Sequence, residues 1–329
     1  MNANQINHDK TIFTPRSAAN GFVKVLAPGT VANLVCGFDV LGMCLNEPND
    51  LMEVKLLNEK KIIIHSADGY PLPLDPAQNT AGAPLVEMIN ELDTPTGFEV
   101  TIHKKIKPGS GIGSSAASAA GAVVAANNLL GNIFSKKDLV RFAMFGEKVA
   151  SGVKHADNVA PCIYGGITLI RSIHPLDIIS IPSPDFFVTI VHPQIEVRTK
   201  DARQILRKEV LLKDAIRQWG NIAGLVAGFM QGDLDLIGRS LEDVIIEPVR
   251  SILIPGFDEV KSRCKEAGAL GGGISGSGPS IFMLSRDEAT AKKVEAVMQE
   301  TYNRIGLDYN TYVTTINKTG VKIIIENEA

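Results

Sequence analysis

The fold is decided by the stretch Pro108-Gly109-Ser110-Gly111-Ile112-Gly113-Ser114-Ser115-Ala116-Ala117-Ser118. It joins a segment with strand-like alternation, residues 97–104, to an alanine-rich segment of helical length, residues 114–130. Its three glycines permit positive φ angles and let the backbone approach a ligand closely. Because backbone N–H groups gather at a helix N-terminus, the stretch predicts an anion-binding loop between a strand and a helix.

The spacing of this loop argues against the two best-known phosphate motifs. It lacks a Gly-Lys-Ser/Thr ending, and its glycines follow G-x-G-x-G rather than G-x-G-x-x-G. Two hydroxyls follow at Ser114 and Ser115, and successive N–H groups with hydroxyls suit a polyphosphate and its metal ion. The alternative is a glycine-rich turn with two capping serines. The small residues of 114–130 favour the ligand loop, since such a helix must be packed tightly on all sides.

Length and composition indicate a two-domain α/β protein and argue against several classes of partner. The chain has 329 residues, more than one domain usually holds. Its net charge is −3 with dispersed Lys and Arg, which argues against nucleic acid. It has no apolar run of about 18 residues and no signal-peptide pattern, so we expect neither membrane insertion nor export. Four cysteines without a C-x-x-C pair predict reduced thiols and a cytoplasmic location.

The order of predicted elements divides the chain in two. Residues 1–20 are polar and aperiodic, and we expect a mobile extension there. The segment 175–184 contains three prolines and is the candidate boundary between domains at 21–180 and 181–329. A hairpin-rich first half, followed by interleaved strands and helices, predicts an α+β fold. Ser135-Lys136-Lys137-Asp138 matches a capping box and predicts the start of a helix over 136–150.

Two polar clusters are candidate ligand contacts. The early loop, residues 27–42, contains Asn33 and Asp39, which could receive an ammonium or hydroxyl group. The alternative is a turn in which both side chains satisfy local backbone groups. The stretch Lys154-His155-Ala156-Asp157-Asn158-Val159-Ala160-Pro161 could hold a substrate hydroxyl or organise a turn.

Three charged residues stand out in the predicted helices. Glu147 falls between Val140 and Ala143 on the apolar face of helix 136–150, so its carboxylate needs a partner. Bound Mg²⁺, a solvated edge and an arginine partner are the alternatives. Arg203 and Arg250 could serve surface ion pairs, or they could converge on a carboxylate or phosphate.

A second glycine-rich stretch, Gly271-Gly272-Gly273-Ile274-Ser275-Gly276-Ser277-Gly278-Pro279-Ser280, does match G-x-G-x-x-G. It follows a predicted helix and precedes a predicted strand, the reverse of the order in a dinucleotide site. We therefore predict a flexible loop that lines a ligand cleft.

Taken together, these motifs resemble the GHMP kinases, whose phosphate loop has the form P-x-G-S-G-L/I-G-S-S-A. Asn33-Leu34 with Gly37-Phe38-Asp39, the stretch 155–161 and the late Gly276-Ser277-Gly278-Pro279 are similar to the branch that phosphorylates L-homoserine. The motifs occur in order across roughly residues 22–325. The resemblance implies an N-terminal domain like domain 2 of ribosomal protein S5 and a ferredoxin-like C-terminal domain, with both substrates bound between them.

The resemblance also implies a nucleotide site that takes ATP and Mg²⁺. The residues that would wrap the triphosphate are Lys107, Pro108, Gly109, Ser110, Gly111, Ile112, Gly113, Ser114, Ser115, Ala116 and Ala117. Ser115 and Glu147 would hold Mg²⁺, and Asn79 with Thr80 would lie near the adenine.

For the second substrate, L-homoserine, the resemblance implies a pocket in which Asp39 and Asn33 contact the amino group and hydroxyl, and the arginines bind the carboxylate. The implied pocket residues are Asn33, Asp39, His155, Asn158, Thr199, Arg203, Arg250 and Gly276. The implied reaction forms O-phospho-L-homoserine, in threonine biosynthesis. Because its transition state is loose, a strong base is optional. Asn158 is assigned to the place of a base, with Asp157 as the alternative.

Two rival functions stay open. One is a GHMP kinase for another small alcohol, such as mevalonate or a sugar. The other is a non-catalytic nucleotide-binding protein of the same fold. The oligomeric state is also open, with a homodimer as one alternative.

Overall fold

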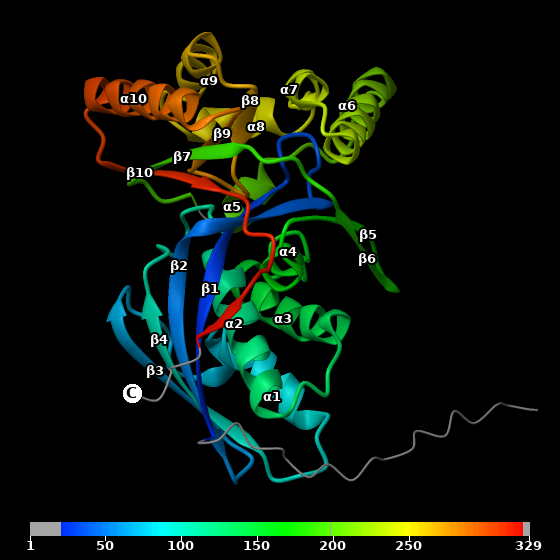
Figure 1. Ribbon diagram of the computed structural model, residues 1–329, viewed down its shortest axis with the longest axis vertical. Coiled ribbons are helices and arrows are strands. Elements are labelled where there is room, and N and C mark those ends of the chain that lie inside the picture. The colour runs from blue at the N-terminus through cyan, green and yellow to red at the C-terminus, as the bar shows by residue number, and fades with distance from the viewer. Residues whose placement is uncertain (1–20, 198, 325–329) are drawn as a thin grey trace, which may run out of the picture.

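The computed structural model describes residues 21–197 and 199–324, and the expected extension at 1–20 lies outside them. Figure 1 shows a lower body, in which one sheet is covered by helices, and an upper body with a second sheet and a helical layer above it. The cleft described below lies where these two bodies meet. Among the described residues, no helix is long and apolar enough to cross a bilayer.

The first sheet contains most of the N-terminal half. Its strands are β1 (Phe22–Ala32), β2 (Leu41–Leu57), β3 (Ile62–Gly69), β4 (Gly97–Lys104), β5 (Ile167–Ile173), β6 (Leu176–Ile181) and β11 (Lys322–Ile324). The order is β11-β1-β2-β4-β3, with β5 beside the start of β2 and β6 beside β5. Among the described strands of this sheet, only β3 and β4 pair in parallel. β1 and β2 pair with a bulge between Pro28 and Thr30, which changes the direction of the strand just before the early loop.

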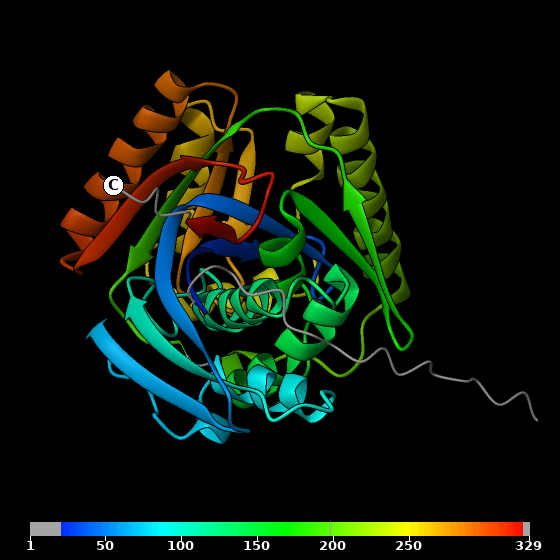
Figure 2. The ribbon, with the colours of Figure 1, turned by 60° about the horizontal axis from the view of Figure 1, so that its bottom comes forward.

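Four helices pack on one side of this sheet: α1 (Gly82–Asn90), α2 (Ser114–Leu129), α3 (Lys136–Ser151) and α4 (Val159–Tyr164). Figure 2 shows these green and cyan helices gathered beneath the blue strands. α2 contacts β1, β2 and the other three helices, which confirms that its small residues are packed on all sides. A Cβ atom added at Gly121 would lie 2.5 Å from Met52 Sδ, so α2 approaches the sheet more closely than a larger residue would allow.

The second sheet has the order β10-β7-β9-β8. Its strands are β7 (Phe187–Pro193), β8 (Gly271–Ile274), β9 (Ile281–Ser285) and β10 (Tyr309–Thr315). The helices of this half are α5 (Thr199–Gln204), α6 (Leu212–Gln231), α7 (Leu234–Ser240), α8 (Glu247–Arg250), α9 (Phe257–Glu266) and α10 (Glu288–Ile305). The predicted loop at 271–280 is therefore part of a hairpin, because Gly271–Ile274 pairs with β9.

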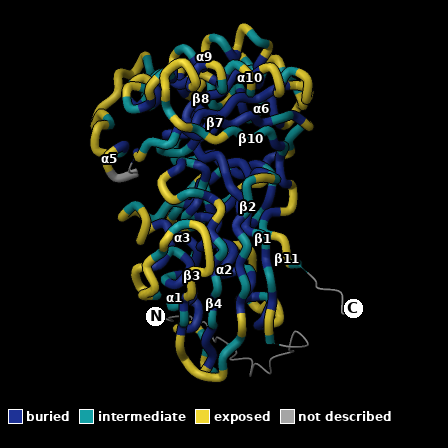
Figure 3. Tube along the Cα trace, turned by 90° about the vertical axis from the view of Figure 1, so that its left-hand side faces the viewer, coloured by how far each residue is buried: buried dark blue, intermediate teal, exposed yellow. Residues whose placement is uncertain are grey.

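The two halves share one hydrophobic core. It includes Val25 of β1, Val188 of β7 and Phe282 of β9, and Figure 3 shows buried segments continuing from the lower into the upper body. The predicted division between residues 180 and 181 falls near the end of β6, and part of the proline-containing segment 175–184 is itself the strand β6. The last strand, β11, pairs with β1 of the first sheet. These connections hold the walls of the cleft together.

Candidate active site

A cleft of about 610 Å³ lies between the helices of the first sheet and the loops of the second. This volume suits a small-molecule ligand. Three segments far apart in sequence form much of its wall: the loop at 108–115, the stretch around residues 155–158, and the turn at Gly276 and Ser277.

The glycine loop enters α2 without a capping side chain. Gly109, Gly111 and Gly113 have φ angles of 74°, 80° and 66°, in the left-handed region that glycine tolerates. Gly113 is the N-cap of α2 and no side chain bonds to the free N–H groups of the first turn. Ser114 turns inward instead and donates its hydroxyl to Ile106 O at 2.8 Å. The loop therefore has the geometry of an anion site rather than of a serine-capped turn.

A close contact between the two glycine-rich stretches fixes the position of this loop. A Cβ atom added at Gly111 would lie 2.6 Å from Ser275 O and 2.7 Å from Gly278 O. Ser275 donates its hydroxyl to Gly111 O at 2.7 Å, and the Ser280 N–H donates to Ser110 O at 3.2 Å. The glycine-rich stretch at 271–280 therefore contacts the loop at 108–118 from the opposite wall of the cleft and fixes its position.

A buried ion pair supports the loop from below. Lys104 pairs with Asp50 and also donates to Ser114 O at 2.7 Å and to Ser118 Oγ at 2.9 Å. Asp50 accepts further hydrogen bonds from the backbone N–H groups of Lys105 and Ile106. Burial lowers the pKa of Lys104, and the charge of Asp50 opposes that shift. Neither residue was singled out from the sequence, because a lysine after a strand carries no signal of burial.

Glu147 on α3 is buried at the edge of the cleft beside Ser115. Burial raises its pKa to about 7, and a hydrogen bond from Ser115 opposes the rise. Its Oε1 atom is buried without a hydrogen-bond partner. The predicted burial of this carboxylate is confirmed, and its free oxygen beside a hydroxyl fits a hard cation such as Mg²⁺. In the described ranges, no group of three or more His, Cys, Asp or Glu side chains could hold a metal ion by itself.

Of the other residues predicted to bind the nucleotide, some line the cleft and some do not. Asn79 and Thr80 line the cleft, and the Asn79 side chain also accepts from the Ala81 and Gly82 N–H groups and donates to Pro73 O. Lys107 donates to Gln194 Oε1 at 2.9 Å, across to the second half of the chain. Some of the predicted loop residues are not part of the cleft wall: Lys107, Ser110, Ile112, Ala116 and Ala117.

The opposite end of the cleft brings together charged side chains from both halves. Arg203 donates to both carboxylate oxygens of Asp39, at 2.8 and 2.9 Å, and lies 3.5 Å from His155 Nδ1. Arg250 donates to Gly276 O at 3.2 Å and to Ala202 O at 3.1 Å. Both guanidinium groups lie over the Phe38 ring, at 5.3 and 4.9 Å from its centroid.

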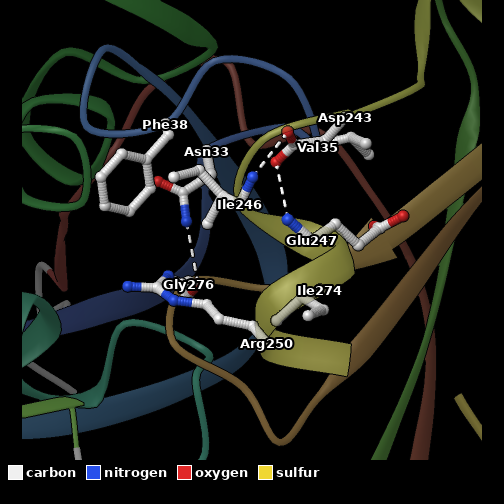
Figure 4. A pocket seen from close by; sticks show the side chains of 9 residues that line it. All are labelled: Asn33, Val35, Phe38, Asp243, Ile246, Glu247, Arg250, Ile274 and Gly276. Carbon is white, nitrogen blue, oxygen red and sulfur yellow. Dashed lines mark hydrogen bonds between the residues drawn. The ribbon is translucent and has the colours of Figure 1, made fainter. Parts of the chain in front are cut away.

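Asn33 connects this end to the late glycine turn. Figure 4 shows its side chain between Phe38 and Arg250, with the amide nitrogen directed at Gly276. Its Nδ2 donates to Gly276 O at 2.8 Å, and its Oδ1 accepts from the Asp39 N–H at 3.1 Å. The predicted convergence of Asn33, Asp39, Arg203 and Arg250 on one pocket is therefore present in the structure. Thr199 begins α5, and its side chain lies outside the described residues.

The early loop holds strained backbone. Asn33, Leu34 and Val35 are consecutive residues with φ angles of 72°, 42° and 68°, and Asp39 has a φ of 61°. Each such residue costs roughly 1–2 kcal/mol, most of all the β-branched Val35. An ordinary turn has no need of this sequence of angles, so the strain favours the ligand interpretation of the loop.

Burial shifts the pKa values of three titratable side chains in the cleft: Asp157, His155 and Arg250. It raises the pKa of Asp157 to about 8, helped by the negative charges of Asp39 and Glu147, and Asp157 Oδ1 has no hydrogen-bond partner. It lowers the pKa of His155, which favours a neutral imidazole at physiological pH. It also lowers the pKa of Arg250 to about 10, with the charge of Arg203 as a further cause. Perturbed groups in one cleft are typical of a functional site.

The structure adds residues that the sequence did not single out. Phe38 contacts both arginines through its ring, and Thr30 donates its hydroxyl to Asn158 Oδ1 at 2.8 Å. Thr30 is a polar residue inside the early loop, three positions before Asn33. That position was the available signal.

Comparisons with known proteins agree with this geometry. The family described as GHMP kinases N terminal domain matches residues 79–166, and GHMP kinases C terminal matches residues 225–304. The crystal structure of L. major mevalonate kinase in complex with R-mevalonate has a TM-score of 0.70 at 14% identity, over 93% of this chain and 98% of that one, which shows a shared fold alone. Fold, glycine loop and family matches together define a GHMP kinase.

Two more similar proteins narrow the family. The homoserine kinase of Chloroherpeton thalassium is 45% identical over 312 residues, covering 91% of this chain and 98% of that protein. The crystal structure of homoserine kinase from Cytophaga hutchinsonii has a TM-score of 0.89 at 48% identity, over 94% of this chain and 99% of that one. The chain belongs to the homoserine kinase family of the GHMP kinases.

Proposed function

We propose that the protein transfers the γ-phosphoryl group of ATP to the side-chain hydroxyl of L-homoserine, forming ADP and O-phospho-L-homoserine. One observation carries the proposal. A single cleft contains an uncapped helix N-terminus at one end and a cluster of Asp39, Arg203 and Arg250 at the other. The first suits a polyphosphate, and the second suits a zwitterion that has both an ammonium and a carboxylate group.

At the nucleotide end, the backbone of the glycine loop and the first turn of α2 bind the triphosphate. Ser115 and Glu147 would hold Mg²⁺, because a hydroxyl and a buried carboxylate oxygen without a partner meet there. The ion would neutralise charge on the phosphate oxygens. Asn79 and Thr80 line the same cleft and lie on the adenine side of the site in this proposal.

At the other end, Asp39 receives the α-ammonium group, and Arg203 and Arg250 bind the α-carboxylate. Asn33 and the Gly276 backbone hold the positions of these groups through their own hydrogen bonds. His155, with a lowered pKa and an unpartnered Nε2, offers a neutral hydrogen-bonding atom beside Asp39. This arrangement places the side-chain hydroxyl of L-homoserine toward Asn158 and the glycine loop.

Catalysis in this proposal comes from positioning and charge neutralisation. Phosphoryl transfer has a loose transition state with little charge on the attacking oxygen, so a strong base is not required. Asp157 has a pKa of about 8 and is therefore mostly protonated at neutral pH, which makes it a poor base in the free enzyme. Asn158 lines the cleft and contacts the reacting groups by hydrogen bonding. Four buried free cysteines fit a reducing compartment, and we place the reaction in the cytoplasm.

A coupled ADP-release assay tests this function. With ATP and Mg²⁺, we expect turnover with L-homoserine and at least about tenfold lower kcat/KM with mevalonate, whose lack of an ammonium leaves Asp39 without a partner. A sugar alcohol serves as the second comparison. Faster turnover of mevalonate or the sugar would assign another small-alcohol substrate. Binding of ATP without turnover of any alcohol would indicate a non-catalytic nucleotide-binding protein.

A further inference from the structure

Thr30 lies behind the cleft, where β1 ends and the glycine loop passes. It is fully buried, and its N–H donates to Ile112 O at 3.2 Å. A Cβ atom added at Gly113 would lie only 1.9 Å from Thr30 Oγ1, so the hydroxyl lies directly against the loop backbone. The bulge between Pro28 and Thr30 produces this placement, because a bulge redirects the side chains that follow it.

The hydroxyl of Thr30 has a defined acceptor. It donates to Asn158 Oδ1 at 2.8 Å, between residues 128 positions apart in the chain. Asn158 is the N-cap residue of α4 and makes no side-chain cap bond there, so its orientation is not set by its own helix. A carboxamide whose oxygen is already engaged presents its N–H₂ group to other ligands. Since Asn158 lines the cleft, that group is the part available to a substrate.

We propose that Thr30 is a positioning residue for phosphoryl transfer: by holding Asn158 Oδ1, it turns the Asn158 amide N–H₂ toward the reacting hydroxyl and phosphate. The backbone N–H of the same residue bonds to the glycine loop, so one buried residue fixes the distance between the triphosphate site and Asn158. Asn158 then acts as a hydrogen-bond donor rather than as a proton acceptor. This inference rests on the proposed phosphorylation of L-homoserine.

The primary test compares Thr30→Val, which keeps the shape and removes the hydroxyl, with Thr30→Ser, which keeps the hydroxyl. We expect Thr30→Val to lower kcat about 10- to 100-fold, the scale of one buried hydrogen bond, with both KM values changed less than about threefold. Thr30→Ser should retain kcat within about threefold of the wild-type value. Wild-type kcat in Thr30→Val, or equal losses in both variants, would overturn the proposal.

A double-mutant cycle separates positioning from a general effect on the fold. If Thr30 acts through Asn158, Thr30→Val adds less than about twofold to the kcat loss of Asn158→Ala. Additive losses would overturn the proposal. Asn158→Asp is a further check that does not need the valine variant to fold. The aspartate can accept from Thr30 but has no N–H₂ group, so its kcat should be as low as that of Asn158→Ala, and near-wild-type kcat would contradict the assigned orientation.

A spectroscopic readout keeps this inference distinct from the proposed function. In ¹⁵N-labelled protein, the side-chain amide signal of Asn158, identified by its loss in Asn158→Ala, should shift in Thr30→Val and stay in place in Thr30→Ser. An unshifted signal in Thr30→Val would reject the contact. If the wild-type enzyme fails to phosphorylate L-homoserine, the proposed reaction is rejected, and this measurement alone decides whether Thr30 orients Asn158.

Discussion

The two ends of the cleft differ in how their polar groups are paired. At the phosphate end, formed by the glycine loop and Glu147, polar groups lack hydrogen-bond partners. At the Asp39 end, the charged side chains are already engaged in ion pairs and hydrogen bonds. Glu147 Oε1 is buried and unpartnered, and the N-terminus of α2 has no side-chain cap. Asp39 is engaged by Arg203, and Arg250 by backbone carbonyl oxygens. The two ends therefore differ in kind: one has polar groups without hydrogen-bond partners, and the other has charged groups that neutralise one another.

The difference indicates how each end meets its ligand. Burying an unpaired polar group costs free energy, so ligands at the phosphate end relieve a cost that the free protein carries. In the proposed complex, the ammonium and carboxylate of the substrate would exchange with charges that are already paired in the free protein, and the net charge of the pocket would be unchanged. The first end should therefore be the more sensitive to mutation in turnover, and the second in substrate affinity.

The largest effect should follow Glu147→Gln, which removes the charge but keeps the shape. We expect kcat to fall about 100-fold or more and the Mg²⁺ titration to move to higher concentration, because the amide is a weak ligand for this ion. The matched control is Glu91→Gln, since Glu91 is exposed and paired with Arg141. An unchanged Mg²⁺ titration would remove Glu147 from the metal site and erase the proposed difference between the two ends.

Intermediate effects are expected for Arg203→Ala and Arg250→Ala. Each should raise the KM for L-homoserine roughly 10- to 100-fold, the scale of a charge-assisted hydrogen bond, and change the KM for ATP by less than about threefold. Steady-state kinetics with each substrate varied in turn measures this. Arg217→Ala is the control, because Arg217 is exposed on α6 and pairs with Glu242. Equal changes in both KM values would argue against carboxylate binding by the arginines.

The smallest effect on turnover should come from Asp157→Asn, at the junction of the two ends. Because Asp157 is mostly protonated at neutral pH, its neutral isostere should change kcat by less than about tenfold. A loss of about a thousandfold, with the fold intact, would identify Asp157 as a general base instead.

The same variant makes a pH-dependent prediction for stability. The pKa of Asp157 rises from 3.8 to about 8 on folding, so between these values the folded state binds more protons than the unfolded state. The wild-type free energy of unfolding therefore falls as pH rises through this window, by on the order of 6 kcal/mol for this group. Urea unfolding of the ligand-free protein should show similar stability at pH 4 and a relative gain for Asp157→Asn at pH 9. A pH-independent difference would contradict the raised pKa.

Much of the nucleotide half could be predicted because its signals are local. The capping box at Ser135 and Asp138 is present as predicted, and the periodicity of α3 placed Glu147 in the buried sector. The glycines of the loop predicted positive φ angles, and the structure has them. Capping, helical periodicity and φ angle depend on residues within a few positions, so sequence spacing is sufficient evidence for them.

The partners of individual side chains were not predictable in the same way. Asn79 was expected beside adenine, yet its amide also organises the turn before α1, and Lys107 reaches Gln194, which directly follows β7. Residues 271–274 were expected in a loop and instead pair with β9. Backbone hydrogen bonds of a strand come from a neighbour chosen by the tertiary fold, and so glycines that look like a loop can form an edge of a sheet.

By itself, the sequence determined the class of fold, the positive φ angles of the glycine loop and the burial of Glu147, and it predicted a set of polar residues for the second substrate. Only the tertiary structure decided that Asp39 pairs with Arg203 across 164 positions, that two arginines lie over the Phe38 ring, and that Thr30 donates to Asn158. The physical reason is the distance along the chain over which each kind of interaction acts. Dihedral preferences and periodicity act along the chain, whereas the distance and protonation of charged groups depend on which surfaces the folded chain brings together and removes from water.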